Sequence, residues 1–264
     1  MKKLFLFLFF TPTIILAQSL DVLFIGNSYT YANNMPQMVS ELAFSFGDTL
    51  NFESSTPGGA TFNTHSTNIN TLNKISQKPW DYVVLQDQSQ NPSLSPSYVS
   101  ANVYPYGSQL IDLIEINNIC TEPIFYMTWG RKYGDQSNCS SYPPVCTYLG
   151  MQQRLKESYL SMGMNNDASV SPVGISFKNS IDLDSTIDLY SPDYSHPSIY
   201  GSYLAACTFY STIFKKSSVS SSYKPNSISS AEALFLQQVA SSTVLDSLSV
   251  WNIFEASFDI NIIK

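Results

Sequence analysis

Short apolar runs alternate along the chain with longer segments whose apolar positions recur at helical spacing. This alternation is typical of a parallel sheet with helices on both faces. The apolar runs predict five strands: Asp21 to Ile25, Thr49 to Ser54, Asp81 to Gln86, Pro123 to Thr128 and Ser169 to Phe177. The periodic segments predict helices at Met35 to Phe46, Asn68 to Ser76, Tyr98 to Asn117, Leu149 to Met162, Ser198 to Phe214 and Ser229 to Leu248. We therefore expect one α/β domain, a three-layer α/β/α sandwich around a five-stranded parallel sheet.

Residues 1–17 have a different pattern from the rest of the chain. Met1-Lys2-Lys3 precedes an apolar run from Leu4 to Ala17, and such a basic start, short apolar run and final small residue are typical of a secretory signal peptide. A membrane anchor is the alternative, but the run is shorter than the roughly 20 residues that span a bilayer, and Pro12 interrupts it. We expect cleavage near Ala17, a mature domain of residues 18–264, and a location in the periplasm or outside the cell.

The charge of the chain limits its ligands. The formal net charge is −7, and removal of Lys2 and Lys3 with the signal peptide changes it to −9. An acidic chain without a basic run is unsuited to nucleic acid, and anionic membranes or polyanionic glycans would repel it. We expect neutral ligands, and the 17 tyrosines and 16 phenylalanines include enough flat amphipathic rings to bind sugars as well as to fill a core.

The four cysteines favour one disulfide in an exported protein. Cys139 and Cys146 bracket a short loop that Pro143 and Pro144 stiffen, and one bridge could close that loop. Cys120 and Cys207 are expected to be buried as small apolar side chains. Because the sequence has no C-x-x-C motif and only two distant histidines, we expect no metal site.

Two short strings carry the candidate chemistry. Gly26-Asn27-Ser28-Tyr29-Thr30 directly follows the first predicted strand, and Asp193-Tyr194-Ser195-His196 lies near the far end of the chain. A serine at such a strand-to-helix turn is exposed at the carboxyl edge of the sheet, and it becomes a nucleophile when a carboxylate-held imidazole accepts its proton. We predict Ser28 as the nucleophile, His196 as the base and Asp193 as its carboxylate. Other carboxylates nearby are alternatives to Asp193: Asp182, Asp184 and Asp188.

These strings resemble the SGNH, or GDSL, hydrolase superfamily, whose first block is usually G-D-S and whose last block is D-x-x-H. Here the first block is G-N-S. The string Pro57-Gly58-Gly59-Ala60-Thr61 falls where that family keeps an oxyanion-hole glycine, and the segment Trp80 to Pro92 falls where it has G-x-N-D, which is absent. The resemblance implies the flavodoxin-like SGNH hydrolase fold and a secreted esterase-like branch with a Q-x-Q-S third block.

The same resemblance implies an oxyanion hole. Its donors would be the backbone N–H groups of Ser28 and Gly59 and one side-chain amide near the third block, with a plain tight turn as the alternative role of Gly59. Three amides are candidates for the side-chain donor: Gln88, Gln90 and Asn91. Further candidates for contact with substrate are His65, seven residues past Gly58, and Trp129 and Arg131, an indole and a guanidinium that follow a strand end. Each of these three residues is also compatible with a structural role.

The resemblance further implies a secreted serine esterase that removes acetyl or other small acyl groups, and the neutral-ligand argument favours a carbohydrate parent. Its substrate would be a small-molecule or oligosaccharide ester, and the triad mechanism needs no cofactor. Acyl transfer to a sugar and a lipase-like activity are alternatives on the same triad. The changed third block leaves open a glycan-binding protein that has kept the fold and lost the activity.

Overall fold

The computed structural model describes residues 17–254. Apart from Ala17, the predicted signal peptide lies outside the described residues. Five parallel strands form one sheet in the order β2-β1-β3-β4-β5. The strands are β1 (Ser19–Ile25), β2 (Thr49–Ser55), β3 (Tyr82–Leu85), β4 (Glu122–Tyr126) and β5 (Ser169–Ser171). The predicted five-stranded parallel sheet is confirmed.

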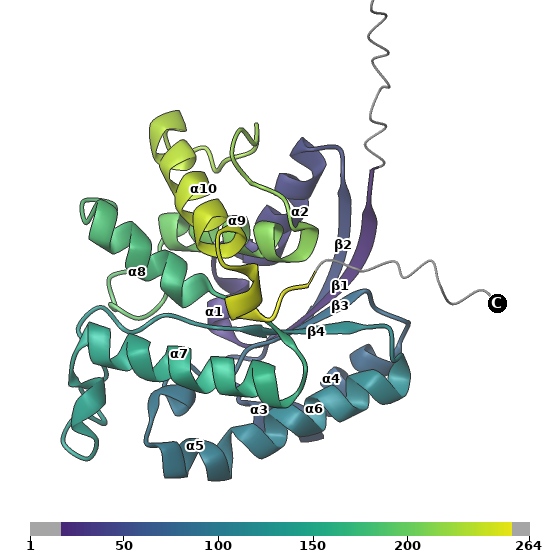
Figure 1. Cartoon of the computed structure of the whole chain (residues 1–264), viewed down its shortest axis with the longest axis vertical. Coiled ribbons are helices and arrows are strands. Elements are labelled where there is room, and N and C mark those ends of the chain that lie inside the picture. The colour runs from purple at the N-terminus through teal and green to yellow at the C-terminus, as the bar shows by residue number, and fades with distance from the viewer. Residues whose placement is uncertain (1–16, 255–264) are drawn as a thin grey trace, which may run out of the picture.

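Helices cover both faces of the sheet (Figure 1). One face carries α2 (Met35–Ser45), α8 (Val173–Leu183), α9 (Ile199–Phe214) and α10 (Ser230–Leu245). The other face carries α3 (Phe62–Thr67), α4 (Ile69–Ser76), α5 (Pro96–Asn102), α6 (Tyr104–Asn117) and α7 (Tyr148–Asn165). The single turn α1 (Ser28–Tyr31) follows β1, and short 3₁₀ helices are η1 (Ala32–Asn34), η2 (Asn91–Ser93), η3 (Pro143–Cys146) and η4 (Leu248–Trp251).

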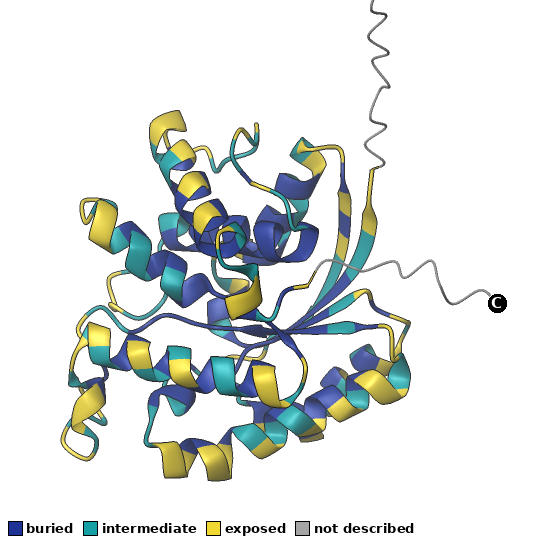
Figure 2. Cartoon of the chain, viewed as in Figure 1, coloured by how far each residue is buried: buried dark blue, intermediate teal, exposed yellow. Residues whose placement is uncertain are grey.

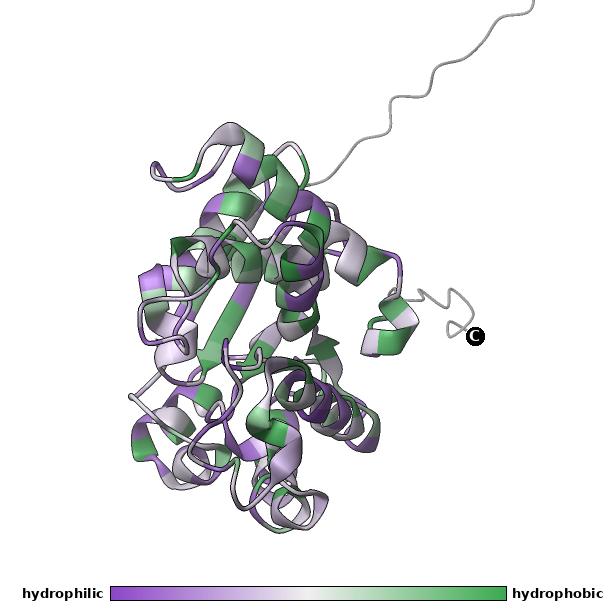
Figure 3. Cartoon of the chain, turned by 90° about the vertical axis from the view of Figure 1, so that its left-hand side faces the viewer, coloured by the Kyte–Doolittle hydropathy of each residue, from purple (hydrophilic) through white to green (hydrophobic). Residues whose placement is uncertain are grey.

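Strand β1, which lies between β2 and β3, contributes to both hydrophobic cores because successive strand residues point to opposite faces. Val22 and Phe24 pack with α2, α9 and α10, whereas Leu23 and Ile25 pack with the helices of the other face. In Figure 2 the inward helix faces and most of the sheet are buried, whereas the first residues of β1 and β2 are exposed, and the buried strand segments are hydrophobic in Figure 3. Burial on both faces explains why residues 22–25 of β1 form a continuous apolar run and do not alternate with polar residues.

The structure corrects two predicted elements. The last strand ends at Ser171, and residues 173–183 form α8, because Pro172 at the start of this helix provides no N–H for the sheet. Val173 and Phe177 lie four residues apart and pack into the core as residues of one helix face. The predicted helix from Tyr98 to Asn117 is two helices, α5 and α6, and a proline lies in the first turn of α6.

The disulfide prediction is confirmed, since Cys139 and Cys146 are bonded and their Cα atoms lie 4.6 Å apart. Cys207 is buried as expected, and burial raises the pKa of its thiol to about 12. The expected burial of Cys120 is wrong. This residue lies in the exposed turn before β4, where its N–H donates to Asn118 Oδ1. Within residues 17–254, no helix combines the length and apolar character needed to cross a bilayer.

Candidate active site

The candidate site lies at the carboxyl edge of the sheet, where an open parallel sheet places its ligands. Segments that follow four adjacent strands meet there with the loop before α9. They enclose a pocket of about 260 Å³. Its lining residues are Asn27, Ser28, Tyr29, Gly59, Gln88, Ser89, Arg131, Ser195 and His196.

The turn between β1 and α1 presents Ser28 to this pocket. A Cβ atom on Gly26 would lie 2.3 Å from Thr30 Oγ1 and 2.7 Å from Gln86 Oε1, so no larger residue fits. Asn27 caps α1, because its side-chain oxygen accepts the N–H of Tyr29 at 3.1 Å. These local contacts fix the backbone on either side of the serine.

Ser28, His196 and Asp193 form a hydrogen-bonded series. His196 Nε2 lies 2.8 Å from Ser28 Oγ, and His196 Nδ1 lies 2.5 Å from Asp193 Oδ2. Burial alone would raise the pKa of Asp193, but hydrogen bonds from His196 and the backbone N–H of Ser195 outweigh it, and the net pKa is lowered. Asp193 is therefore held as a carboxylate beside the imidazole.

The other carboxylates near His196 in sequence are occupied elsewhere. Asp188 Oδ2 is ion-paired with Lys132 at 2.7 Å. Asp184 accepts hydrogen bonds from its neighbour Thr186, and Asp182 pairs with Lys178. Of the four candidate acids, the structure brings only Asp193 to the imidazole.

The loop that carries Asp193 and His196 is closed on itself. Tyr190 and Pro197 form an isolated antiparallel bridge, and the N–H of Ser191 donates to the carbonyl oxygen of His196 at 2.8 Å. Inside this loop, Asp193 Oδ1 accepts the backbone N–H groups of both Ser195 and His196. One carboxylate therefore orients the imidazole and shapes the backbone that presents it.

Two of the predicted oxyanion donors line the pocket beside Ser28. Gly59 adopts φ +70°, a conformation that favours glycine, although no atom would obstruct a Cβ there. Gln88 also lines the pocket, and its side chain is held by Gln90. Its Oε1 accepts the N–H of Gln90 at 2.7 Å, and its Nε2 donates one hydrogen to Gln90 Oε1 at 3.0 Å. Among the described residues, Gln90 Oε1 is the one acceptor of Gln88 Nε2, and the second hydrogen of this amide has no protein partner.

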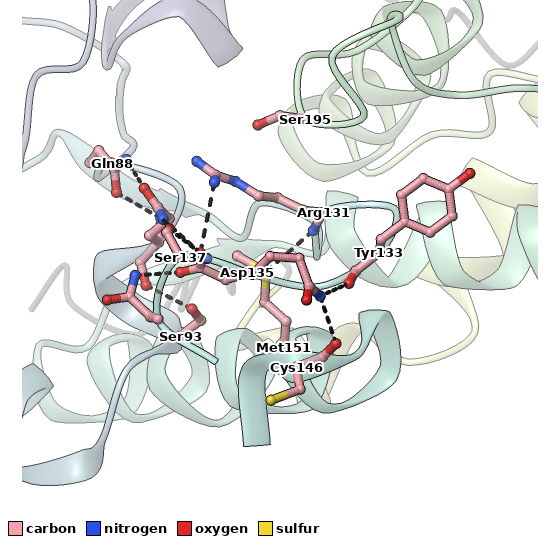
Figure 4. A network of polar contacts seen from close by, with 12 residues as sticks. Gln88, Ser93, Arg131, Tyr133, Asp135, Ser137, Cys146, Met151 and Ser195 are labelled. Atoms are coloured by element: carbon pink, nitrogen blue, oxygen red, sulfur yellow. Dashed lines mark hydrogen bonds and ion pairs between the residues drawn. The ribbon is translucent and has the colours of Figure 1, made fainter. Parts of the chain in front are cut away.

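The amides of Gln90 and Asn91 are used elsewhere. Gln90 Nε2 donates to Asp135 Oδ1 and to Ser137 Oγ, both at 2.9 Å (Figure 4). Asn91 Nδ2 points to the carboxylate of Asp87 at 3.4 Å. Neither side chain lines the pocket, so the structure separates these two from Gln88.

His65 and Trp129 are buried and neither lines the pocket, so the structure gives both the supporting role that the sequence also allowed. His65 Nε2 lies 2.8 Å from the carbonyl oxygen of Gly26, which requires an N–H there, and burial lowers the pKa of this imidazole. Trp129 stacks on Tyr29 at 4.7 Å between ring centroids, and its Nε1 donates to the carbonyl oxygen of Ser195 at 3.0 Å. Both residues support the backbone around the triad instead of facing the pocket.

Several residues at the site were not predicted from the sequence. The Tyr29 hydroxyl lies 2.5 Å from Ser195 Oγ, and its ring packs edge-on against His196. Its position next to Ser28 was an available signal. Asp135 is fully buried behind the pocket and has no neighbouring motif that could have identified it. Within residues 17–254, no group of three His, Cys, Asp or Glu side chains could hold a metal ion.

The parallel sheet order and this edge site define the SGNH hydrolase class of fold. A family model described as a domain of unknown function (DUF4886) matches residues 55–243, and the chain belongs to this family. No curated protein matches the chain in sequence.

Solved structures share the fold. A DUF4886 family protein from Bacteroides uniformis superposes with a TM-score of 0.73 at 18% identity, covering 86% of this chain and 95% of its own. A candidate SGNH hydrolase from Slackia heliotrinireducens gives 0.61 at 25% identity, covering 74% and 99%. An acetylxylan esterase from Geobacillus stearothermophilus gives 0.53 at 13% identity, covering 76% and 96%. The resemblance to SGNH hydrolases is thus confirmed at the level of the fold.

Proposed function

We propose that this chain is an exported serine esterase that removes acetyl or other small acyl groups from carbohydrate. The observation that carries the proposal is the series Ser28 Oγ, His196 Nε2 and Asp193 Oδ2, with contacts of 2.8 and 2.5 Å at the wall of an open pocket. The sugar acetyl ester is supported by analogy alone, because a structural neighbour is an acetylxylan esterase.

The proposed reaction begins with proton transfer. His196 holds its proton on Nδ1 toward the Asp193 carboxylate, which leaves Nε2 as the acceptor for the Ser28 proton. Ser28 Oγ then attacks the ester carbonyl carbon. As the alcohol leaves, it takes the proton from Nε2, and water later releases the acyl group from Ser28 by the same base.

The negative oxygen of the tetrahedral intermediate needs donors that are already in place. The backbone N–H groups of Ser28 and Gly59 supply two. The free hydrogen of Gln88 Nε2 supplies the third, since this residue lines the pocket and its amide cannot rotate without losing the N–H of Gln90. Gln88 thus takes the place of the block-three asparagine that the family pattern leads one to expect.

The proposal is tested with 4-nitrophenyl acetate and an acetylated xylo-oligosaccharide. We expect both to release acetate, and Ser28→Ala to lower the rate by several powers of ten with an unchanged Tm. A fluorophosphonate probe should label Ser28 in the wild-type protein. Ser89→Ala is the matched control, because this hydroxyl lines the same pocket without contacting His196. A folded Ser28→Ala protein with near-normal turnover would disprove the mechanism.

A further inference from the structure

A second hollow, of about 250 Å³, adjoins the triad pocket. The two share Arg131 and Ser195. Tyr133 and Tyr194 form part of its wall, and both are substantially exposed, with ring centroids 4.9 Å apart. Exposed tyrosine rings of this kind offer an apolar face and a polar tip to a sugar.

The backbone holds Tyr194 in this position at some cost. Its φ of +60° is unusual for a bulky residue. Its carbonyl oxygen accepts the N–H of Lys132 at 3.0 Å, which ties the triad loop to the segment after β4. Strain of this kind is tolerated where the surrounding structure determines the conformation, and it is concentrated at functional sites.

The hollow lies on the side of the site where an alcohol would leave. In the proposed reaction, His196 returns its proton to the alcohol oxygen, so the alcohol must lie next to the imidazole. Residues 193–195, which directly precede His196, line the hollow. The alcohol portion of the ester therefore occupies this hollow, a step that rests on the proposed function.

Arg131, at the junction of the two cavities, has a guanidinium with little hydrogen bonding. Its Nε is buried without a partner, and its nearest charged contact is Asp135 Oδ1 at 3.8 Å, too long for a hydrogen bond. The guanidinium also interacts with the hydroxyl of Tyr29. By contrast, the neighbouring Lys132 is paired with Asp188 at 2.7 Å.

Asp135 leaves the N–H groups of Arg131 available, because the Asp135 carboxylate already accepts hydrogen bonds from other groups. Oδ1 accepts Ser137 Oγ at 2.6 Å and Gln90 Nε2 at 2.9 Å, and Oδ2 accepts Asn138 Nδ2 at 2.6 Å. Figure 4 shows these contacts converging on Asp135 while Arg131 approaches from one side. The planar guanidinium is thus left with N–H groups for a ligand.

We propose that Arg131 binds a carboxylate on the alcohol portion of the substrate, so that the enzyme hydrolyses acyl esters of acidic sugars of the uronic acid class. A guanidinium fork matches a carboxylate with two parallel hydrogen bonds. Two acids near this region would repel a carboxylate, but both are engaged. Asp135 accepts four hydrogen bonds from other described residues, and Asp193 is paired with His196. Salt largely screens charges that lie farther away than the Debye length of roughly 8 Å, so the net negative charge of the chain does not by itself exclude an acidic ligand. This proposal departs from the neutral ligand that composition alone favoured.

The test uses two esters that differ in one group. Both are methyl glycosides acetylated at the same hydroxyl, one of glucuronic acid and one of glucose. We expect the wild type to favour the acidic ester about 10-fold or more in kcat/KM, the size expected for a charge-assisted pair. Arg131→Gln should lose that preference, measured as the ratio of kcat/KM for the two esters within that variant. Lys132→Gln, which removes the adjacent cation, should keep the preference.

Binding to the Ser28→Ala protein separates this inference from the proposed function. In NMR titrations, the unesterified glucuronoside should bind more tightly than the glucoside, and Arg131→Gln should abolish the difference. That result supports the subsite even if no ester is hydrolysed. Equal affinity for both glycosides, or a preference that survives Arg131→Gln, overturns the inference even if both esters are hydrolysed. It is also overturned if Arg131→Gln slows both esters equally, because the guanidinium would then serve the oxyanion.

Discussion

The side-chain amide of Asn27 donates a hydrogen bond to the carbonyl oxygen of Ala60 over 2.9 Å, in a buried position. This bond joins the turn that presents Ser28 to the turn that presents Gly59. The aspartate that usually occupies this position in the family's G-D-S block has no hydrogen to donate when it is ionised. The G-N-S variation is therefore matched to its surroundings in this chain.

Replacing Asn27 with the family's usual residue should damage the protein. Asn27→Asp would place a carboxylate 2.9 Å from a carbonyl oxygen, and loss of the donor in a buried site costs about 1–3 kcal/mol. We expect a lower Tm and slower hydrolysis of 4-nitrophenyl acetate, because the distance between Ser28 and Gly59 is no longer fixed. Asn63→Asp makes the same charge change at an exposed position of α3 and should alter neither. An unchanged Asn27→Asp protein would show that the bond is dispensable.

Three alanine variants distinguish the amides after β3. Gln88→Ala should lower kcat roughly 10²-fold to 10³-fold with little change in KM, because its amide meets charge that develops only in the transition state. Gln90→Ala should have a smaller effect of the same kind, since Gln90 orients Gln88 but does not itself line the pocket. Asn91→Ala should have almost none. Steady-state kinetics on a small acetyl ester decide the order, and near-wild-type rates for all three variants would place the third donor elsewhere.

The carboxylate of the triad is tested by two amide substitutions. Asp193→Asn keeps an oxygen for the backbone N–H groups of Ser195 and His196 but favours the wrong imidazole tautomer, so kcat should fall about 10⁴-fold. Asp188→Asn removes only the ion pair with Lys132 and should leave kcat within a few-fold of the wild type. The same loss in both variants would mean that the loop responds to charge in general.

Much of the fold is predictable from the sequence because buried parallel strands are apolar runs, as β1 illustrates. The end of β5 is not predictable in this way. Its strand has three residues, and the apolar residues from Val173 to Phe177 suit either a strand or the inner face of a helix. Pro172 ends the strand, and packing against α9 and α10 then favours the helix.

At the site, residues whose geometry is local were predictable and residues placed by distant contacts were not. The turn at Gly26 and the closed loop from Asp193 to His196 are encoded within a few positions. Which amide faces the pocket depends instead on Asp135, 45 positions beyond Gln90. Likewise, the burial of Trp129 depends on stacking against Phe177 from another element.

Asp87, directly before Gln88, couples the stability of this region to pH. Burial raises the pKa of its carboxyl from 3.8 to about 7, although hydrogen bonds from the Gln88 and Phe62 N–H groups and from Asn91 act in the opposite direction. The folded protein therefore holds this proton more tightly than the unfolded chain does. Between about pH 4 and pH 7 the unfolded chain binds fewer protons, so the free energy of unfolding falls as pH rises through that window.

Asp87→Asn should remove this loss. Its Tm relative to the wild type should rise as pH increases from 4 to 8. The corresponding gain in the free energy of unfolding, relative to the wild type, is on the order of 1–4 kcal/mol once the native carboxyl is ionised. Thermal unfolding in steps of one pH unit measures the effect, and Asp112→Asn, at an exposed position of α6, provides the reference for pH effects on the rest of the molecule. An asparagine at position 87 can still accept the N–H of Gln88, so the segment behind the pocket keeps its main contact. A Tm difference that stays constant or falls across this range would mean that Asp87 is already ionised in the folded protein well below pH 7.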